Sequence, residues 1–335
     1  MFKRFYTLII IYILIFSNIS VAGDLLEDDF FEGFTGRIEL CSFGIASNSN
    51  IIPFPDNEYE ERNNNNENIS ELSKSKRYLF AGKSSLPFNI EYALESGTIV
   101  YLGTPFYDDA REGVTFGIEK EFESFVGDFS VFGNGADVWE DPYLTNEDRV
   151  VTTEFNSGLV LNISEINGTG LGFSLKTKYK FIDDDIIGER YSDLEREGFV
   201  HSVIIKYNQI FDVKEKKSPN DLTYKISFNH ADINGASNSY NSIALGLKGT
   251  YWYKEISIGL STDYENRIYK KEHSIFNIIK KERVLTNGVI VTFNNLGKSK
   301  NWYIRSGFSV VNILSNISFY DSDSFMVLFS LGYNF

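Results

Sequence analysis

The chain has 335 residues, with 32 Lys and Arg against 46 Asp and Glu, so its formal net charge is −14. That acidic balance disfavours a basic nucleic-acid-binding surface, and 1 Cys with 3 His excludes an internal disulfide and a cysteine-rich zinc module. Aromatic residues reach 16% although the mean hydropathy is only −0.19, a balance typical of a barrel with a lipid-facing outside and a wet interior.

Residues 1–22 have the order of a secretory signal peptide. Lys3 and Arg4 precede an apolar run over 5–16, and the small residues Ser20 and Ala22 follow at alternate positions. Because the run is shorter than the roughly 20 residues of a membrane-spanning helix, we predict cleavage after Ala22 rather than an anchor. No later run reaches the roughly 18 apolar residues of a transmembrane helix, so a soluble periplasmic protein and an outer-membrane barrel remain as alternatives. Residues 23–33 are predicted to be a short periplasmic tail.

Hydrophobic alternation with period two favours the barrel over the soluble alternative. In 169–182, apolar and aromatic side chains alternate with Lys176, Lys178 and Lys180, and three lysines in one phase cannot face a packed core. The last stretch ends on Phe335, an aromatic C-terminus that we interpret as a signal for the barrel-assembly machinery. The pattern predicts an all-β, transmembrane antiparallel up-and-down barrel over 34–335, of fourteen strands or alternatively twelve. The strands are predicted at 34–45, 78–94, 98–106, 113–125, 127–138, 153–166, 169–182, 197–210, 221–230, 240–252, 254–264, 281–293, 302–312 and 324–335.

The connections between these strands are predicted to alternate between short periplasmic turns and longer outer loops. The turns are placed at 95–97, 125–127, 167–168 and 253–254, and the loops at 46–77, 139–152, 183–196, 231–239, 265–280 and 312–323. Loop 46–77 is polar and rich in Asn, so we expect it to be mobile. Two features fit poorly: the connection 211–221 is long for a turn, and Lys120 falls in a lipid-facing phase. Either a bulge shifts that strand, or Lys120 reaches the periplasmic headgroups.

Catalytic and cofactor motifs are weak in this sequence. His201 and His230 fall in lipid-facing phase near the outer ends of their strands, and Ser84 and Ser242 are candidate hydroxyls. Rim histidines, however, are more often interfacial side chains. The glycines of 168–172 lie in a hairpin rather than between a strand and a helix, which excludes a dinucleotide fingerprint. Acidic clusters such as 183–185 lack EF-hand spacing and are interpreted as loop surface, with lipopolysaccharide a potential partner. We therefore predict no enzyme, no catalytic residue, no cofactor and no metal site.

Charged side chains occupy the phase that faces the interior. Basic and acidic groups would then stand on different walls and produce a field across the pore that favours small polar or charged solutes. The alternative is that these charges pair with one another and seal the lumen. The predicted pore-lining residues are Arg37, Glu119, Glu121, Glu123, Lys176, Lys178, Lys180, Lys206, Lys225, Lys248 and Arg305.

Several short motifs resemble an uncharacterised domain-of-unknown-function family of Gram-negative outer-membrane proteins. They are Phe34-Thr-Gly36, the stretches 100–104 and 139–143, and the terminal Gly332-Tyr-Asn-Phe335. The resemblance implies a barrel in the cell outer membrane and no particular activity or site residue. The first hypothesis is a passive porin-like diffusion channel. The second is a closed barrel whose loops bind a surface or lipopolysaccharide, and the third is an outer-membrane hydrolase.

Overall fold

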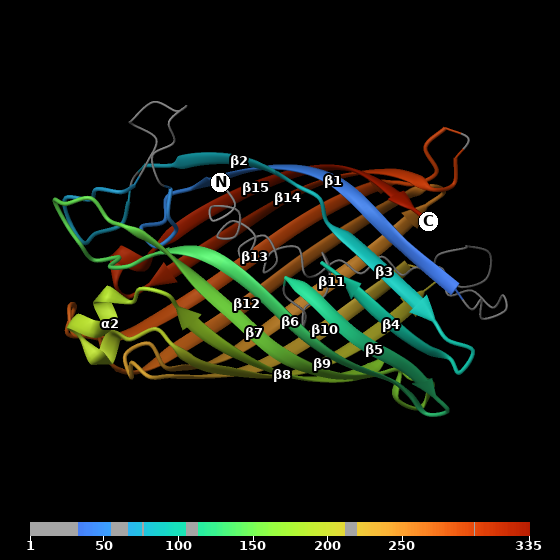
Figure 1. Cartoon of the computed structure of the whole chain (residues 1–335), viewed down its shortest axis with the longest axis horizontal. Helices are drawn as coiled ribbons and strands as arrows, with labels where there is room; N and C mark the ends of the chain where they lie inside the picture. Colours follow the sequence, from blue (N-terminus) through green and yellow to red (C-terminus); the bar gives the residue numbers. More distant parts are fainter. Residues whose placement is uncertain (1–32, 55–65, 76, 105–112, 212–219, 298) are drawn as a thin grey trace.

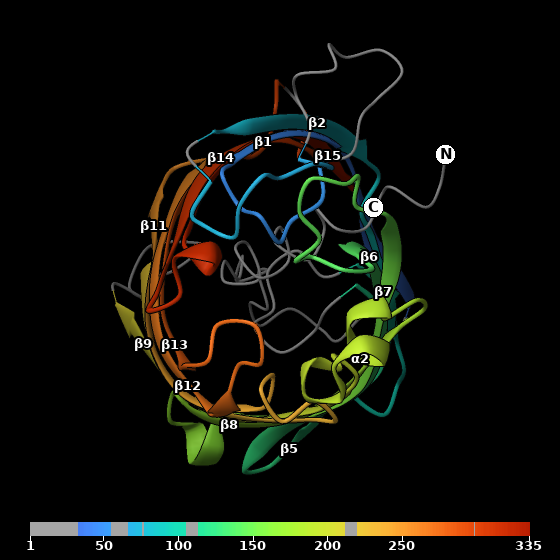
Figure 2. The same cartoon turned by 90° about the vertical axis from the view of Figure 1, so that its left-hand side faces the viewer.

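The computed structural model describes residues 33–54, 66–75, 77–104, 113–211, 220–297 and 299–335. The predicted signal peptide, nearly all of the predicted tail and residues 212–219 of the long inner connection lie outside this part of the chain. Within it, β-strands form one antiparallel sheet in which β15 pairs with β1. Because this pairing joins the first strand to the last, the sheet closes on itself as a barrel (Figures 1 and 2).

The strands follow one another around the ring in chain order. They are β1 (Gly33–Ser47), β2 (Leu79–Ser85), β3 (Phe88–Ala93), β4 (Thr98–Gly103), β5 (Val114–Phe122), β6 (Phe125–Trp139), β7 (Val151–Ser164), β8 (Leu171–Ile182), β9 (Gly198–Phe211), β10 (Asn220–Ile233), β11 (Tyr240–Tyr253), β12 (Ile256–Glu272), β13 (Ile279–Phe293), β14 (Trp302–Ser315) and β15 (Ser322–Asn334). Short helical turns lie in the connections: η1 (Ile166–Gly168), α2 (Ile186–Arg190), η2 (Ser192–Leu194) and η3 (Ser318–Tyr320). Among the described residues, no helix is long and apolar enough to cross a membrane.

β2 and β3 act as one wall strand interrupted at Leu86-Pro87. Both strands pair with β1. β2 pairs with the second half of β1, and β3 pairs with its first half. Proline has no backbone N–H and interrupts the ladder, but the carbonyl of Pro87 still accepts a 2.9 Å bond from the Glu39 amide. The wall therefore has the 14 strands of the first prediction, and the alternative of twelve is wrong.

The outside of the barrel is apolar. Phe34 and Leu40 of β1 and Phe80 of β2 are 72%, 61% and 61% exposed, while Glu39 and Cys41, on either side of Leu40, are buried. A closed antiparallel sheet satisfies its own backbone hydrogen bonds, so this apolar surface can face hydrocarbon. The chain therefore folds as a closed β-barrel with an apolar outside, as the alternation predicted.

Long loops gather at one end of the barrel and short turns at the other (Figure 1). One predicted turn is wrong, because 125–127 lies inside β6 and the chain turns instead at Glu123-Ser124. The rings of Phe122 and Phe125 stack at 4.7 Å across this tight turn. Lys120 pairs in regular register with Thr98 and Gly127, so no bulge shifts the strand. It lies close to the short-turn end, where its amine can reach headgroups.

Candidate functional site

The predicted basic pore-lining residues all lie in the phase opposite to the exposed apolar side chains. On β8, for example, Lys176, Lys178 and Lys180 alternate with Leu175, Tyr179 and Phe181, which are 41%, 37% and 39% exposed. The same inward phase holds Arg37 on β1, Lys206 on β9, Lys225 on β10, Lys248 on β11 and Arg305 on β14. That these groups line a conducting pore stays a prediction.

Fewer acidic side chains than predicted face the interior from β5. Glu119 faces inward from β5, and Glu121 has the same phase one residue before the end of the strand. Glu123 lies in the turn between β5 and β6, so its placement on the wall is wrong. The tight hairpin ends the strand before it, because Phe122 and Phe125 already form the last pair.

Ion pairs hold several of the inward charges against the wall. Lys180 of β8 contacts Glu154 of the neighbouring β7 at 2.6 Å. Lys225 of β10 reaches Asp263 of β12 at 2.6 Å by crossing β11 at Gly246, where a Cβ would lie 2.4 Å from the carboxylate. The first pair joins adjacent strands, and the second joins strands with one strand between them. Both pairs therefore run along the wall.

A third pair lies in a buried network across the closing seam. Arg305 of β14 contacts Glu39 of β1 at 2.7 Å, and both side chains are buried. Tyr303 donates to Glu39 at 2.7 Å and Ser330 of the intervening β15 donates to it at 3.0 Å. The carboxylate therefore has several partners, as a buried charge requires.

Arg149 joins two loops at the outer mouth. Its Nη1 donates to the carbonyls of Asn50 at 2.9 Å and Pro142 at 3.0 Å, and its Nη2 donates to the carbonyl of Asn66. Its guanidinium also stacks 4.4 Å from the ring of Trp139. Although burial lowers its pKa to about 10, the group is charged at neutral pH. The described parts of the loop expected to be mobile are therefore packed onto the loop that follows β6.

A second contact point at the mouth is built around His273. Its Nε2 lies 3.0 Å from the Tyr143 hydroxyl and 2.7 Å from the Tyr320 hydroxyl, and the two hydroxyls also bond to each other. The amide of Ile275 donates to Nδ1 at 3.3 Å. Burial is the largest cause that lowers the pKa of His273 to about 4, and the nearby charge of Lys280 adds to it. The ring is therefore neutral and ties together loops that precede β7, β13 and β15.

The sequence reasoning missed His273 and weighed the other two histidines instead. His201 and His230 face outward and pair across β9 and β10. Ser242 faces inward and donates to Glu265 at 2.6 Å, while Ser84 lies on β2, far around the ring. The structure thus does not bring these serines to the histidines. Among the described residues, no group of three or more His, Cys, Asp or Glu side chains is placed to hold a metal ion.

Phe335 lies at the closing seam. Its backbone exchanges two 2.9 Å hydrogen bonds with Gly36 of β1. A Cβ at Gly36 would lie 2.5 Å from the backbone carbonyl of Asn89 and 2.7 Å from the Phe335 ring, so the glycine allows both to lie close to β1.

A family model described as protein of unknown function (DUF2860) matches residues 33–334. The chain belongs to this family. The resemblance drawn from the short motifs is therefore confirmed. No curated protein matches the chain.

Solved structures similar to this DUF2860 chain are outer-membrane proteins. OmpT of Vibrio cholerae, folded in vitro, is 8% identical with a TM-score of 0.40, covering 93% of this chain and 100% of that one. The outer membrane channel DcaP of Acinetobacter baumannii is 12% identical with a TM-score of 0.41, covering 90% and 98%. OpdK of Pseudomonas aeruginosa, solved with vanillate, is 10% identical with a TM-score of 0.41, covering 92% and 100%.

Proposed function

We propose that this DUF2860 protein is a passive, porin-like diffusion channel for small polar or charged solutes. The observation that carries the proposal is the direction of the lumen ion pairs. Lys180–Glu154, Lys225–Asp263 and Arg305–Glu39 each bridge strands that are adjacent or one strand apart. Because each pair joins nearby strands, it runs along the wall and does not span the lumen. Fourteen strands also give a diameter between filled eight-stranded barrels and open porins.

The basic side chains give the channel a weak anion preference. Six inward lysines lie on the consecutive strands β8 to β11: Lys176, Lys178, Lys180, Lys206, Lys225 and Lys248. The ion pairs of Lys180 and Lys225 reduce the field but do not cancel it, since a pair at the wall still presents a dipole to a passing solute.

Single-channel recording of the refolded full-length chain in planar bilayers tests the proposal. We expect discrete conductance steps and a reversal potential that favours the anion in a salt gradient. Changing Lys176, Lys178 and Lys180 to Glu should reverse or weaken that preference. The matched control changes Lys270, Lys271 and Lys281 to Glu, because these three residues lie at the loop ends of β12 and β13 and not within the central wall. Equal reversal potentials for the two triple variants would contradict the inward basic wall.

The second candidate is a closed barrel whose loops bind a surface or lipopolysaccharide without transport. The packing at Arg149 and His273 favours it, because both residues fasten loops over the mouth. Electrical silence of folded protein across a wide range of voltages would select this function over the channel.

We propose no catalytic activity, since Ser242 and His201 lie on opposite faces of the wall. As partners we propose outer-membrane lipid and lipopolysaccharide, and the barrel-assembly machinery acting through Phe335. We propose no binding of nucleic acid, because the net charge is −14. Hydrolysis of vesicle phospholipid that is lost in His201→Ala would revive the enzyme hypothesis.

A further inference from the structure

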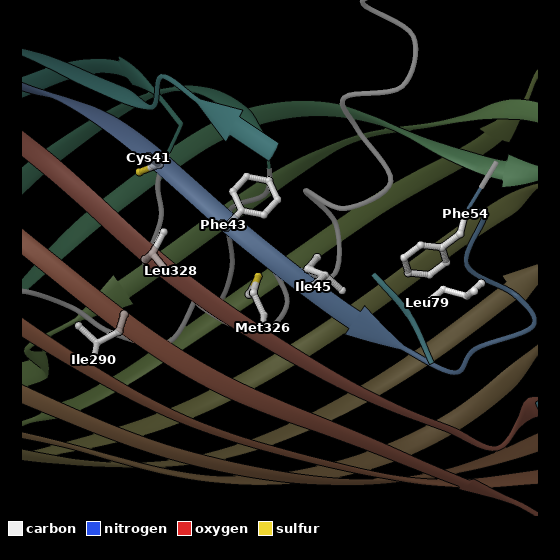
Figure 3. Close-up of a cluster of buried hydrophobic side chains, with 8 residues drawn as sticks. All are labelled: Cys41, Phe43, Ile45, Phe54, Leu79, Ile290, Met326 and Leu328. Atoms are coloured by element: carbon white, nitrogen blue, oxygen red, sulfur yellow. The ribbon is translucent and has the colours of Figure 1, made fainter. Parts of the chain in front are cut away.

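Two basic side chains of β13 lie on the outside of the barrel. The inner face of this strand is marked by Ile290, which packs in a buried cluster with Cys41, Phe43, Ile45, Phe54, Leu79, Met326 and Leu328 (Figure 3). Lys281 and Arg283 have the opposite phase and are exposed. Asn266 of β12 is exposed as well and lies directly opposite Arg283 in the sheet. The three side chains therefore share one part of the outer surface.

This part of the surface lies where the apolar outside of the barrel ends. Eight residues from the short-turn ends of β9 to β14, the outward side chains are all apolar or aromatic: Val203, Phe228, Leu245, Tyr264, Leu285 and Val310. Ten residues from the same ends, all but one are polar or charged: His201, His230, Ile243, Asn266, Arg283 and Asn312. Ten residues correspond to about 26 Å along the barrel axis, at about 3.4 Å per residue and a strand tilt of about 40°. Because the apolar band of such barrels is about 25 Å tall, Arg283 lies at its loop-end border and Lys281 just beyond it.

No group of the protein neutralises these two charges within the part of the chain that the structure describes. The side chains of Lys281, Arg283 and Asn266 have no hydrogen bond, ion pair or ring contact there. β13 and β14 carry no outward carboxylate, and β12 carries none before Glu272, its last residue. A cation beside hydrocarbon is costly without a partner, so these groups need an anion that the membrane supplies.

We propose that the outer face of β13 binds a phosphate monoester on the headgroup of an outer-leaflet glycolipid, as lipopolysaccharide carries. Such a group has a charge of about −1.5 to −2 at neutral pH. Lys281 and Arg283 together match this charge, although the chain as a whole carries −14. The inference rests on the proposed place of the barrel in the outer membrane and names the site at which that lipid binds.

The spacing of the side chains suits one phosphate. Lys281 and Arg283 are two residues apart on one strand, which separates their Cα atoms by about 6.8 Å. Their long side chains can therefore converge on a single phosphate, with the guanidinium donating two parallel hydrogen bonds and the ammonium acting as a point charge. The amide of Asn266 adds a donor from the neighbouring strand. The acyl chains of the same lipid then lie against the apolar surface below, at Tyr264 and Leu285.

Native mass spectrometry of the refolded full-length chain in detergent micelles tests the site. The protein is titrated with lipid A, the phosphorylated anchor of lipopolysaccharide, and with dephosphorylated lipid A. EDTA in the buffer removes divalent ions that would bridge phosphates to carboxylates. Arg283→Gln is compared with the matched control Lys120→Gln, which removes one outward cation at the short-turn end.

We expect half-saturation at a concentration at least tenfold lower for lipid A than for its dephosphorylated form. Arg283→Gln should raise the half-saturation for lipid A at least tenfold, and Lys120→Gln should leave it within twofold. Equal half-saturation for the two forms of lipid A, or equal effects of the two variants, would overturn the site. Displacement of lipid A by millimolar inorganic phosphate, or binding of phosphatidylglycerol as tight as that of lipid A, would overturn the glycolipid as its occupant.

Folding of each variant is checked by heat-modifiable migration in gels. If the Arg283→Gln protein does not fold, Lys281→Gln carries the same comparison from the next outward position of β13. The binding measurement does not depend on ion conduction, so failure of the phosphate site and failure of the channel are distinguishable.

Discussion

Acidification should release the loops that His273 ties together at the outer mouth. Its Nδ1 accepts the amide of Ile275, and its Nε2 lies between the hydroxyls of Tyr143 and Tyr320. A second proton on the ring would turn Nδ1 into a donor facing the Ile275 N–H. Burial of the ring is the largest cause that lowers its pKa from 6.5 to about 4, and the nearby charge of Lys280 lowers it further.

The size and direction of the effect follow from linkage. The packed loop binds a proton less readily than the open loop, so its stability is greatest above about pH 6.5 and is lost as the pH falls from there toward 4. At pH 4.5 the loss is about 2.5 kcal/mol, or roughly 75-fold in the ratio of open to packed loop. The pKa of about 4 already includes the effect of Lys280, which lowers it, and that of the Asp193 carboxylate, which raises it. Because hydrogen bonds from Ser274 and Ser237 lower the pKa of Asp193, it keeps its charge at pH 4.5.

Amide hydrogen exchange in 273–278 measures the opening. After correction for the intrinsic pH dependence of exchange, rates at pH 4.5 should exceed those at pH 7.5 by one to two orders of magnitude. In His273→Gln the corrected rates should be fast and independent of pH. Unchanged corrected rates in the natural sequence, or the same pH dependence in His273→Gln, would refute the reasoning.

Three further predictions concern the other contacts. Arg149→Lys should raise the rate at which protease cleaves loop 46–77 at least tenfold. One ammonium cannot replace a guanidinium that donates hydrogen bonds to several carbonyls. Cleavage as slow as in the natural sequence would contradict this. Arg305→Met should lower the free energy of unfolding in detergent by about 3–5 kcal/mol, since it leaves the buried Glu39 carboxylate without its charge partner. Adding Glu39→Gln should recover most of that loss in urea titrations, and no recovery would argue against the pair as its cause. Gly36→Ala should reduce the folded, heat-modifiable fraction in the outer membrane, because the new methyl group would lie 2.5 Å from the backbone carbonyl of Asn89 and 2.7 Å from the Phe335 ring. Gly44→Ala, where a Cβ meets nothing within 4 Å, is the control.

The strand pattern of this chain could be predicted from sequence because the membrane enforces it. Wherever a strand crosses hydrocarbon, every second side chain is mostly apolar, and the lysines of β8 alternate with Leu175, Thr177, Tyr179 and Phe181 in that way. The predicted ends of strands were wrong where a strand continues beyond the membrane. β12 continues to Glu272, eight residues beyond the predicted end at Tyr264, since a strand in water no longer needs apolar neighbours.

The candidate site was predictable only in part for a related reason. Inward phase follows from alternation, so Lys176 could be placed inside without a structure. Its ion-pair partners could not, because Lys225 and Asp263 meet across an intervening strand at a register that only the fold defines. Arg149 and His273 carry no periodic signal at all, because their partners are backbone carbonyls and hydroxyls of distant loops.

The pairing of β1 with β15 also determines when the barrel can close during synthesis and export. Arg37 lies opposite Asn334, so the ring cannot close until almost the whole polypeptide has been synthesised and exported. Contacts this distant in sequence form slowly. Until then the apolar strands must travel as an open chain, and carriers that prevent their aggregation are as necessary to this protein as the membrane that receives it.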